Sequence, residues 1–357
     1  MSGSPRPTVH WQALALRPSG SGVQTYIREL LGALTPQLAA GGDPRLVAHV
    51  QRDAVDELPP GVEAAPHPVV DGARRALLGL ALCTGSGLLH GLDVDLPLRH
   101  RGPTVVTVHD LSVFDVPWAH SRLRSRGEQA LVARSLRRAD AVVAVSGFTA
   151  ERVRERFGRE ATVTHLAPSA DMRPASSEEV ERVRERYGLG TDSVLCVGTI
   201  EPRKRVPLLA QACEQAGVPL VLAGGLGEGQ SVPSSARHLG YVPGEDLPAL
   251  YAAAAVVAYV STYEGFGLPP VEAMACGGAV VATRVGALPE VLEAEAAEAL
   301  VPPDDVDALA AALRSAVRDA DRNAALRAAG LRAVGHLGWE RTAVTTLEVY
   351  RSLGVPC

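Results

Sequence analysis

The sequence is short of lysine, of aromatic residues and of long apolar runs. Lys204 is the only lysine among 35 lysine and arginine residues, and aromatic residues make up 4% of the 357. No run reaches the roughly 18 apolar residues that a membrane-spanning helix needs, and we expect no secretion signal. Hydrophobic residues at 46% and charged residues at 21% are typical of a soluble globular protein.

The cysteines and the charges narrow the class of protein. The five cysteines show no close pairing or C-x-x-C spacing, which predicts reduced, buried thiols in a cytoplasmic protein: Cys83, Cys196, Cys213, Cys276 and Cys357. Residues 1–170 hold 19 basic and 16 acidic side chains, whereas residues 171–357 hold 16 and 24. This distribution argues against a nucleic-acid partner and leaves room for an acidic substrate on the first half.

The spacing of apolar runs predicts an α/β protein of two domains. Short β-branched runs alternate with helix-length segments, which is typical of parallel sheets covered on both faces: 104–108, 141–145, 194–197, 220–223, 256–260 and 279–282. A first strand within 8–16 has a weak pattern. Two prolines in 167–174 mark a boundary, so we expect domains at 1–170 and 171–335, with a helix in 336–357 returning to the first domain.

The segment 261–278 carries the strongest functional signal. It follows the apolar run 256–260, and Pro269 and Pro270 favour a helix start that Gly277 and Gly278 end. Ligands of open parallel sheets bind at such strand ends, where the N–H groups of Phe266, Gly267 and Leu268 could face an anion. We place Glu264 in the loop and Glu272 in the first helical turn. The pair predicts a diphosphate site flanked by a sugar and a ribose, although either glutamate alone is typical of a solvated charge.

A second strand end carries three cations. The run 194–198 leads into Thr199, Glu201 and then Arg203-Lys204-Arg205. A compact ammonium suits a phosphate oxygen, whereas a guanidinium favours a bidentate partner. Taken with segment 261–278, this pattern favours phosphate binding over a solvated turn.

Candidate residues of the first half also follow strands. His109 and Asp110 follow 104–108, Ser146 follows 141–145, and His90 follows a weaker run. Gly22 and Val23 precede a helix expected from residue 24, so their N–H groups could meet a phosphate. His109 is interpreted as a site residue on the assumption that the two sheets face each other across a cleft.

Together these segments resemble the retaining glycosyltransferases of family 4. The resemblance covers nearly the whole chain and rests on GSGVQTYIREL (20–30), VVTVHDLSVFDVP (105–117), AVVAVSGFTAERV (141–153), VGTIEPRKR (197–205), LAGGLGEG (222–229) and YEGFGLPPVEAMACGGAVVATRVGALPEVL (263–292). It implies the GT-B fold, in which two Rossmann-like domains face each other across a cleft. The acceptor lies mostly on the first domain and the nucleotide sugar mostly on the second.

The resemblance also implies roles. Glu264 would contact the donor sugar, Glu272 the ribose diol, Arg203 and Lys204 the diphosphate, and His109 the sugar or the charge that develops near it. The other donor-side positions are Gly22, Val23, Thr199, Glu201, Gly265, Phe266, Gly267 and Leu268, and the acceptor-side candidates are His90, Asp110 and Ser146. The resemblance also implies transfer with retention. Because fixed cations can stabilise the leaving diphosphate, we expect no metal and no other cofactor.

Departures from the family pattern affect two places. Thr199 stands where some relatives carry arginine, and Arg205 stands where asparagine or glycine is more usual. Gly278-Ala279 replaces a common Val-Pro pair, which should affect packing more than catalysis.

Several alternatives stay open. Asp93-Val94-Asp95 is a D-x-D pattern but lacks the context of a metal-dependent transferase, and the glycines 225, 227 and 229 do not form the G-x-G-x-x-G fingerprint of a dehydrogenase. A GT-B sugar phosphorylase or a catalytically silent carbohydrate-binding relative also fits. Arginines of 121–138 indicate either a solvated helix face or peripheral contact with the inner face of the membrane: Arg122, Arg124, Arg126, Arg134, Arg137 and Arg138. GDP-mannose and UDP-sugars are equal contenders as donor, and a glycan, a lipid-linked glycan or a small molecule as acceptor.

Overall fold

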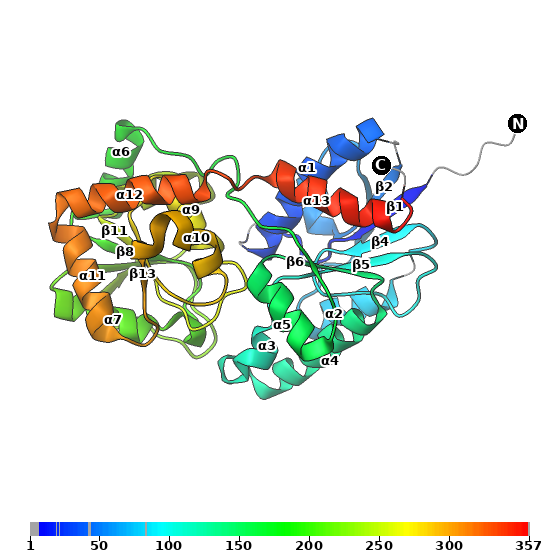
Figure 1. The fold of residues 1–357 in the computed structure, drawn as a ribbon, viewed down its shortest axis with the longest axis horizontal. Coiled ribbons are helices and arrows are strands. Elements are labelled where there is room, and N and C mark those ends of the chain that lie inside the picture. The colour runs from blue at the N-terminus through cyan, green and yellow to red at the C-terminus, as the bar shows by residue number, and fades with distance from the viewer. Residues whose placement is uncertain (1–6, 19, 21, 42–43, 83, 356–357) are drawn as a thin grey trace, which may run out of the picture. The chain divides into compact units, whose positions relative to one another are not determined.

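The chain divides into two compact units in the computed structural model (Figure 1). Unit 1 comprises residues 1–166 and 338–357, and unit 2 comprises residues 167–337. The sequence placed the boundaries after residues 170 and 335. The structure describes residues 7–355 except 19, 21, 42–43 and 83, and without the side chains of 122–124, 293 and 295. Cys83 and Cys357 therefore lie outside the described residues, whereas Cys196, Cys213 and Cys276 are free and buried, as predicted.

Unit 1 is built on a sheet of seven parallel strands in the order β3-β2-β1-β4-β5-β6-β7. The strands are β1 (Thr8–Gln12), β2 (Arg45–Gln51), β3 (Glu63–His67), β4 (Leu88–Gly91), β5 (Thr104–Val108), β6 (Ala141–Ala144) and β7 (Thr162–Val163). After β3 the chain crosses back to the other side of β1. The point between β1 and β4 is therefore the topological switch point, where ligands of open α/β sheets bind.

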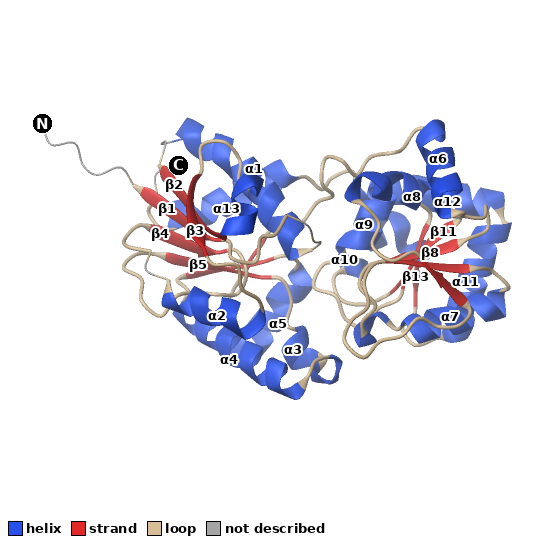
Figure 2. Cartoon of the chain, turned by 180° about the vertical axis from the view of Figure 1, so that it is seen from behind, coloured by secondary structure: helices blue, strands red, loops and turns tan. Residues whose placement is uncertain are grey.

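Helices cover both faces of this sheet (Figure 2). On one face lie α1 (Val23–Gly41) and α13 (Trp339–Ser352), and on the other α2 (Gly72–Ala81), α4 (Arg122–Arg138) and α5 (Gly147–Phe157). Short α3 (Ser112–Asp115), η1 (Arg52–Glu57) and η2 (Pro117–Ala119) lie in connections. The helix predicted at 336–357 is α13, and it packs against α1 within unit 1. Its Tyr350 hydroxyl accepts a 3.0 Å hydrogen bond from Trp11 Nε1 of β1.

Unit 2 repeats the plan with six parallel strands in the order β10-β9-β8-β11-β12-β13. The strands are β8 (Val194–Val197), β9 (Leu220–Ala223), β10 (Ala236–His238), β11 (Val256–Tyr259), β12 (Val280–Thr283) and β13 (Leu300–Val301). The helices are α6 (Ser177–Tyr187), α7 (Val206–Ala216), α8 (Leu247–Ala253), α9 (Leu268–Ala275), α10 (Leu288–Ala296), α11 (Val306–Arg318) and α12 (Ala320–Val334), with short η3 (Pro202–Lys204), η4 (Gly244–Asp246) and η5 (Ala297–Ala299). Here the switch point lies between β8 and β11.

The predicted elements agree with the structure apart from their ends. Strands 104–108, 194–197 and 220–223 match β5, β8 and β9 residue for residue. The first strand ends at Gln12 rather than Leu16, because the chain turns after β1. None of the described helices is long and apolar enough to cross a membrane.

Candidate functional site

The loop after β11 is held from both sides by the ends of neighbouring strands. Thr283 Oγ1, at the end of β12, accepts a hydrogen bond from Ser261 N (2.9 Å) and donates one to the Ser261 carbonyl (2.7 Å). From the side of β8, the Arg203 carbonyl accepts from Thr262 N at 2.9 Å. The loop that carries Glu264 is therefore fixed at the switch point of unit 2.

Glu264 has a buried and well-defined carboxylate. Its Oε1 accepts hydrogen bonds from Ser261 Oγ (2.7 Å) and Arg203 Nη1 (2.5 Å). The backbone beside it is packed against Gly286, where an added Cβ would lie 1.9 Å from the Glu264 carbonyl oxygen. Only glycine therefore fits at this position, whose φ of +57° also favours glycine.

Arg203 lies between two carboxylates. Besides its bond to Glu264, its Nε donates to Glu201 Oε2 at 3.0 Å. These charge-assisted bonds fix the plane of the guanidinium at the carboxyl end of β8. Predicted site residues from two separate segments, Glu201 with Arg203 and Glu264, are thus brought together.

Lys204 is largely buried as a residue, and its charge acts on the nearby Glu272 carboxyl group. The residue is 8% exposed, and within the described part of the chain its Nζ makes no hydrogen bond or ion pair. It lies 5.5 Å from the centroid of the Tyr259 ring. Gly198 makes room for it, since an added Cβ would lie 2.2 Å from Nζ and the φ of Gly198 is +124°. An ammonium group that forms no ion pair is a suitable partner for a phosphate oxygen.

Glu272 lies in the second turn of α9, which corrects the prediction of the first turn. The helix begins at Leu268, so Glu272 is its fifth residue. Its Oε2 accepts a 3.3 Å hydrogen bond from the Tyr251 hydroxyl of α8. Burial raises the pKa of Glu272 to about 7, although the Tyr251 bond and the Lys204 charge oppose that shift. The carboxyl group therefore titrates near neutral pH.

The start of α9 requires a glycine at residue 267. Gly267 has a φ of +91°, and an added Cβ would lie 2.5 Å from Leu288 Cδ2. Phe266 and Leu268 are buried and pack into the core, so only their backbone could serve a ligand. The helix start is therefore placed where the sequence predicted it, next to Glu264 and Gly265.

Two residues of the 199–205 segment differ from the rest. Thr199 is exposed at the mouth of the site. Arg205 forms an ion pair with Asp304, which agrees with the assignment of the diphosphate to Arg203 and Lys204 alone. Its φ of +46° lies in the left-handed region, which glycine and asparagine adopt more readily than arginine.

In unit 1, three predicted residues stay open to a ligand. His109 follows β5, where its Nε2 donates to the Leu92 carbonyl (2.9 Å) and its ring meets Tyr26 edge-on. Asp110 is half-buried and accepts a bond from Ser112 N. Gly22, with a φ of +65°, precedes Val23 at the start of α1, and a Cβ added to it would meet open space. Ser21 of the same loop lies outside the described residues.

Two acceptor-side candidates are structural instead. His90 is fully buried in β4, and its two ring nitrogens bond to the hydroxyl groups of Tyr350 (2.7 Å) and Thr107 (2.8 Å). Burial lowers the pKa of His90 to about 3, so it stays neutral. Ser146 is also buried, and its hydroxyl accepts from Thr149 N as the N-cap of α5. Neither side chain is placed to touch an acceptor.

The sequence analysis missed a polar cluster at the switch point of unit 1. Gln12 ends β1, and Asp93 and Asp95 follow β4, where Arg75 of α2 forms a 3.0 Å ion pair with Asp93. Within the part of the chain that the structure describes, no three His, Cys, Asp or Glu side chains are grouped so that they could hold a metal ion. The D-x-D pattern was the available signal, but its partners Gln12 and Arg75 are distant in sequence.

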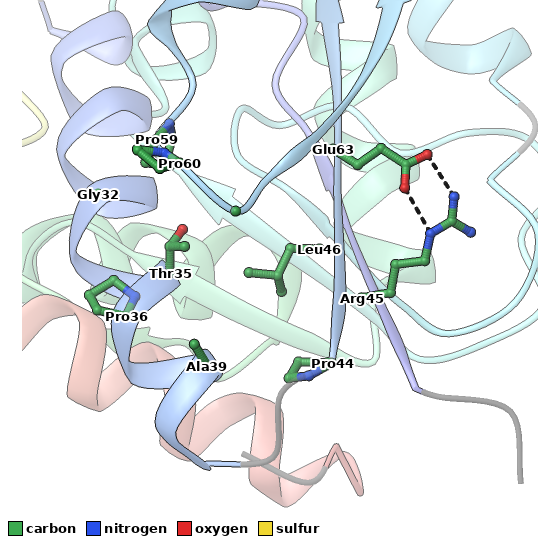
Figure 3. A pocket seen from close by; sticks show the side chains of 11 residues that line it. Gly32, Thr35, Pro36, Ala39, Pro44, Arg45, Leu46, Pro59, Pro60 and Glu63 are labelled. Atoms are coloured by element: carbon green, nitrogen blue, oxygen red, sulfur yellow. Dashed lines mark hydrogen bonds and ion pairs between the residues drawn. The ribbon is translucent and has the colours of Figure 1, made fainter. Parts of the chain in front are cut away.

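The cavity in Figure 3 contains no predicted site residue. It has a volume of about 430 Å³ and lies between α1 and strands β2 and β3, with the Arg45–Glu63 ion pair at one side. Its lining is Gly32, Thr35, Pro36, Ala39, Pro44, Arg45, Leu46, Pro59, Pro60, Gly61 and Glu63. These residues offer little polar complementarity to a nucleotide sugar.

Only some of the described arginine side chains in segment 121–138 are exposed. Arg134 donates to the Leu96 and Pro97 carbonyls, whereas Arg126, Arg137 and Arg138 are exposed on α4. The side chains of Arg122 and Arg124 lie outside the described residues. Membrane contact through 121–138 stays a prediction, which liposome pelleting with and without anionic lipid tests.

Sequence comparisons find glycosyltransferase relatives for both units. The profile "Glycosyl transferases group 1" matches residues 178–332, and "Glycosyltransferase Family 4" matches residues 20–170. O-antigen chain mannosyltransferase B of Escherichia coli is 36% identical over 286 residues, which are 74% of either chain. A D-inositol 3-phosphate glycosyltransferase of Rhodococcus erythropolis is 32% identical over 73% of this chain, although the match spans less than two thirds (63%) of that protein.

Solved structures share the fold. Sucrose-phosphate synthase from Thermosynechococcus elongatus superposes with a TM-score of 0.78 at 23% identity, covering 98% of this chain and 99% of that one. Anabaena HepE in complex with UDP and glucose gives 0.73 at 18% identity over 98% and 100%. The predicted GT-B fold of two parallel-sheet α/β domains is confirmed.

Proposed function

Because the chain belongs to glycosyltransferase family 4, we propose that it transfers a sugar from a nucleoside diphosphate sugar to a carbohydrate acceptor, with retention and without a metal ion. Unit 2 would hold the donor. We further propose mannose as the sugar, since the relative at 36% identity is named a mannosyltransferase. UDP-glucose is the second candidate, because HepE has been solved with UDP-glucose.

The observation that carries this proposal is that Lys204 forms no ion pair among the described residues and follows Arg203 in η3, after the carboxyl end of β8. A diphosphate at the switch point would supply an anionic partner. The neighbouring Arg203 is already oriented by Glu201 and Glu264, so its guanidinium would add directed hydrogen bonds. Both cations are in place before the reaction begins.

These fixed charges suit the chemistry of transfer. Cleavage of the bond between the anomeric carbon and the diphosphate builds negative charge on the leaving oxygen. Cations that need no reorganisation stabilise that charge in the transition state. They would also supply the stabilisation that a metal ion provides in other transferases.

The contacts of Glu264 favour retention by attack on the face of the leaving group. Its Oε1 is already engaged by Arg203 and Ser261, which suits a hydrogen-bonding role better than that of a covalent nucleophile. The departing phosphate would then accept the proton of the acceptor hydroxyl group. Glu272, one turn into α9, would accept hydrogen bonds from the ribose diol.

The test compares two neighbouring cations. We expect Lys204→Met to weaken the binding of GDP or UDP and to lower kcat/KM about a hundredfold, with an unchanged circular dichroism spectrum. Arg205→Met is the matched control, because Arg205 pairs with Asp304. A thermal-shift panel of nucleoside diphosphates first selects the base, since saturation at a hundredfold the Kd adds about 2.7 kcal/mol of stability. Equal behaviour of the two variants would contradict the proposed site.

A further inference from the structure

The last residue of β11 places an aromatic ring beside the Lys204 ammonium. Tyr259 is buried and follows the small apolar residues 256–258 of the same strand. Lys204 Nζ lies 5.5 Å from the centroid of the Tyr259 ring, which is within the roughly 6 Å range of a cation–π contact. No motif of the sequence assigned a role to this side chain.

The pairing of two strands brings Tyr259 and Lys204 together. β8 and β11 are neighbouring parallel strands, so their carboxyl ends meet at the same edge of the sheet. Tyr259 ends β11, and Gly198 directly follows β8. A Cβ added to Gly198 would lie 2.2 Å from Lys204 Nζ, so the ammonium lies beside both strand ends.

An aromatic ring and a carboxylate hold a cation in different ways. A carboxylate accepts the N–H donors of an ammonium and would compete with a phosphate for them, whereas the negative face of a ring attracts the charge without such bonds. Among the described residues Lys204 forms no hydrogen bond or ion pair. Its three N–H donors can therefore all serve a ligand.

The hydroxyl end of Tyr259 reaches the Glu264 side of the site. Burial raises the pKa of Tyr259 well above its usual range, and the Glu264 carboxylate adds to this shift while Arg203 opposes it. The side chain therefore stays neutral and meets Lys204 as a ring rather than as a phenolate anion. One residue thus lies beside both Lys204 and Glu264.

We propose that Tyr259 is a positioning residue of the donor site, whose ring holds the Lys204 ammonium at the carboxyl end of β8 while its N–H donors stay available to the diphosphate. The contribution of a cation–π contact grows when both groups are removed from water, as they are here. Without the ring, ligand binding would have to order a flexible lysine side chain. That the ligand is a diphosphate rests on the proposed function, whereas the contact itself does not.

The first test reads the contact directly, because Lys204 is the only lysine in the chain. The full chain labelled with carbon-13 at lysine Cε gives one Cε–Hε NMR signal, and Lys204→Met confirms its assignment. We expect the ring current of Tyr259 to shift this signal upfield of lysine in an unfolded chain. Tyr259→Leu should abolish the shift, whereas Tyr259→Phe keeps a ring and should retain it.

The second test is a double-mutant cycle on the Kd for the nucleoside diphosphate that the thermal-shift panel selects, measured by calorimetry. We expect Tyr259→Leu to raise the Kd about tenfold in the wild type but not in Lys204→Met, because both changes break the same contact. Tyr259→Phe should keep the Kd within about twofold. Val183→Ala is the control for lost stability, because it removes buried apolar atoms of α6 and should leave the Kd unchanged.

A second variant covers loss of folding. If Tyr259→Leu lacks the circular dichroism spectrum of the wild type, Tyr259→Met takes its place, since the adaptable methionine side chain fills more of the same space.

The outcomes separate this proposal from the proposed function. A Lys204 signal at the position of an unfolded chain in the wild type, or one that Tyr259→Leu leaves unmoved, overturns the contact. Equal losses of affinity from Tyr259→Leu with and without Lys204 overturn the positioning role and indicate a purely structural tyrosine. Failure of the proposed function shows differently, as wild-type protein that binds no nucleoside diphosphate although Tyr259→Leu still moves the Lys204 signal.

Discussion

The two switch points of this protein differ in how fully their polar side chains are paired. In unit 2, Arg203 is paired with both Glu201 and Glu264, whereas Lys204 forms no ion pair among the described residues. In unit 1, Gln12 and Asp95 keep unpartnered atoms. A leaving group develops charge during the reaction and gains from groups that are already fixed. Buried polar atoms without partners, as in unit 1, instead lower the stability of the free protein.

The largest effect is expected at Glu264. Glu264→Gln removes the charge that orients Arg203 and contacts the donor sugar in the proposed complex. We expect kcat/KM to fall roughly a hundredfold to a thousandfold, measured by steady-state transfer. Glu181→Gln on α6 is the control, because that carboxylate is exposed and pairs only at the surface with Arg184. Equal activity of both variants would show that the fixed network of unit 2 is not used in catalysis.

The space around Lys204 can be tested at Gly198. Gly198→Ala places a methyl group against Nζ and strains a φ of +124°. We expect a loss of about 1–3 kcal/mol in unfolding free energy, together with weaker binding of the nucleoside diphosphate by calorimetry. Gly225→Ala is the matched control, since nothing lies within 4 Å of its added Cβ. Unchanged stability and affinity in Gly198→Ala would mean that the Lys204 side chain can move away from the added methyl group.

Stability of unit 1 should depend on Tyr350, a residue outside the proposed donor site. Tyr350→Phe leaves Trp11 Nε1 and His90 Nδ1 without their hydroxyl partner. We expect a loss of about 1–3 kcal/mol in urea unfolding and an unchanged Kd for the nucleoside diphosphate. Tyr241→Phe makes the same chemical change at a side chain that is 72% exposed, and should leave stability unchanged. A shift in Kd with Tyr350→Phe would mean that the units are coupled.

The smallest effect is a pH dependence from Glu272. Its pKa is raised from 4.5 to about 7, so the free unit loses some stability as pH rises through that window. Ribose binding needs the carboxylate, so affinity for the nucleoside diphosphate should rise between pH 6 and 8 by less than about tenfold. The phosphate groups of the ligand also titrate in this pH range and contribute to the pH dependence of affinity measured by calorimetry. Glu272→Gln should remove only the contribution of the carboxyl group. A profile identical to that of the wild type would contradict this role.

The fold could be predicted because local patterns determine it. Buried parallel strands such as 104–108 and 220–223 are continuous apolar runs, and the helix over 177–187 begins with a capping box at Ser176 and Glu179. The segment 261–278 was located correctly for the same reason, since prolines and glycines set its helix ends. Only the turn that holds Glu272 was misplaced, because the helix starts at Leu268.

The errors concern contacts between residues distant in sequence. His90 was taken for an acceptor residue, but its partner Tyr350 comes 260 positions later. Arg205 follows Lys204 in the sequence, and its ion pair with Asp304, far along the chain, was not predicted. Gln12 and Arg75 carry no motif, and only the packing of α2 against the end of β1 brings them together. Burial and pairing of this kind are properties of the assembled sheet.

The return of α13 to unit 1 affects the order in which the molecule can be made. During synthesis the ribosome completes all of unit 2 before it reaches Trp339, so the first sheet emerges long before its covering helix. Until then Trp11 and His90 lack their partner Tyr350, and the face of the sheet that α1 and α13 share is only partly covered. The earlier-translated domain is therefore the later one to mature.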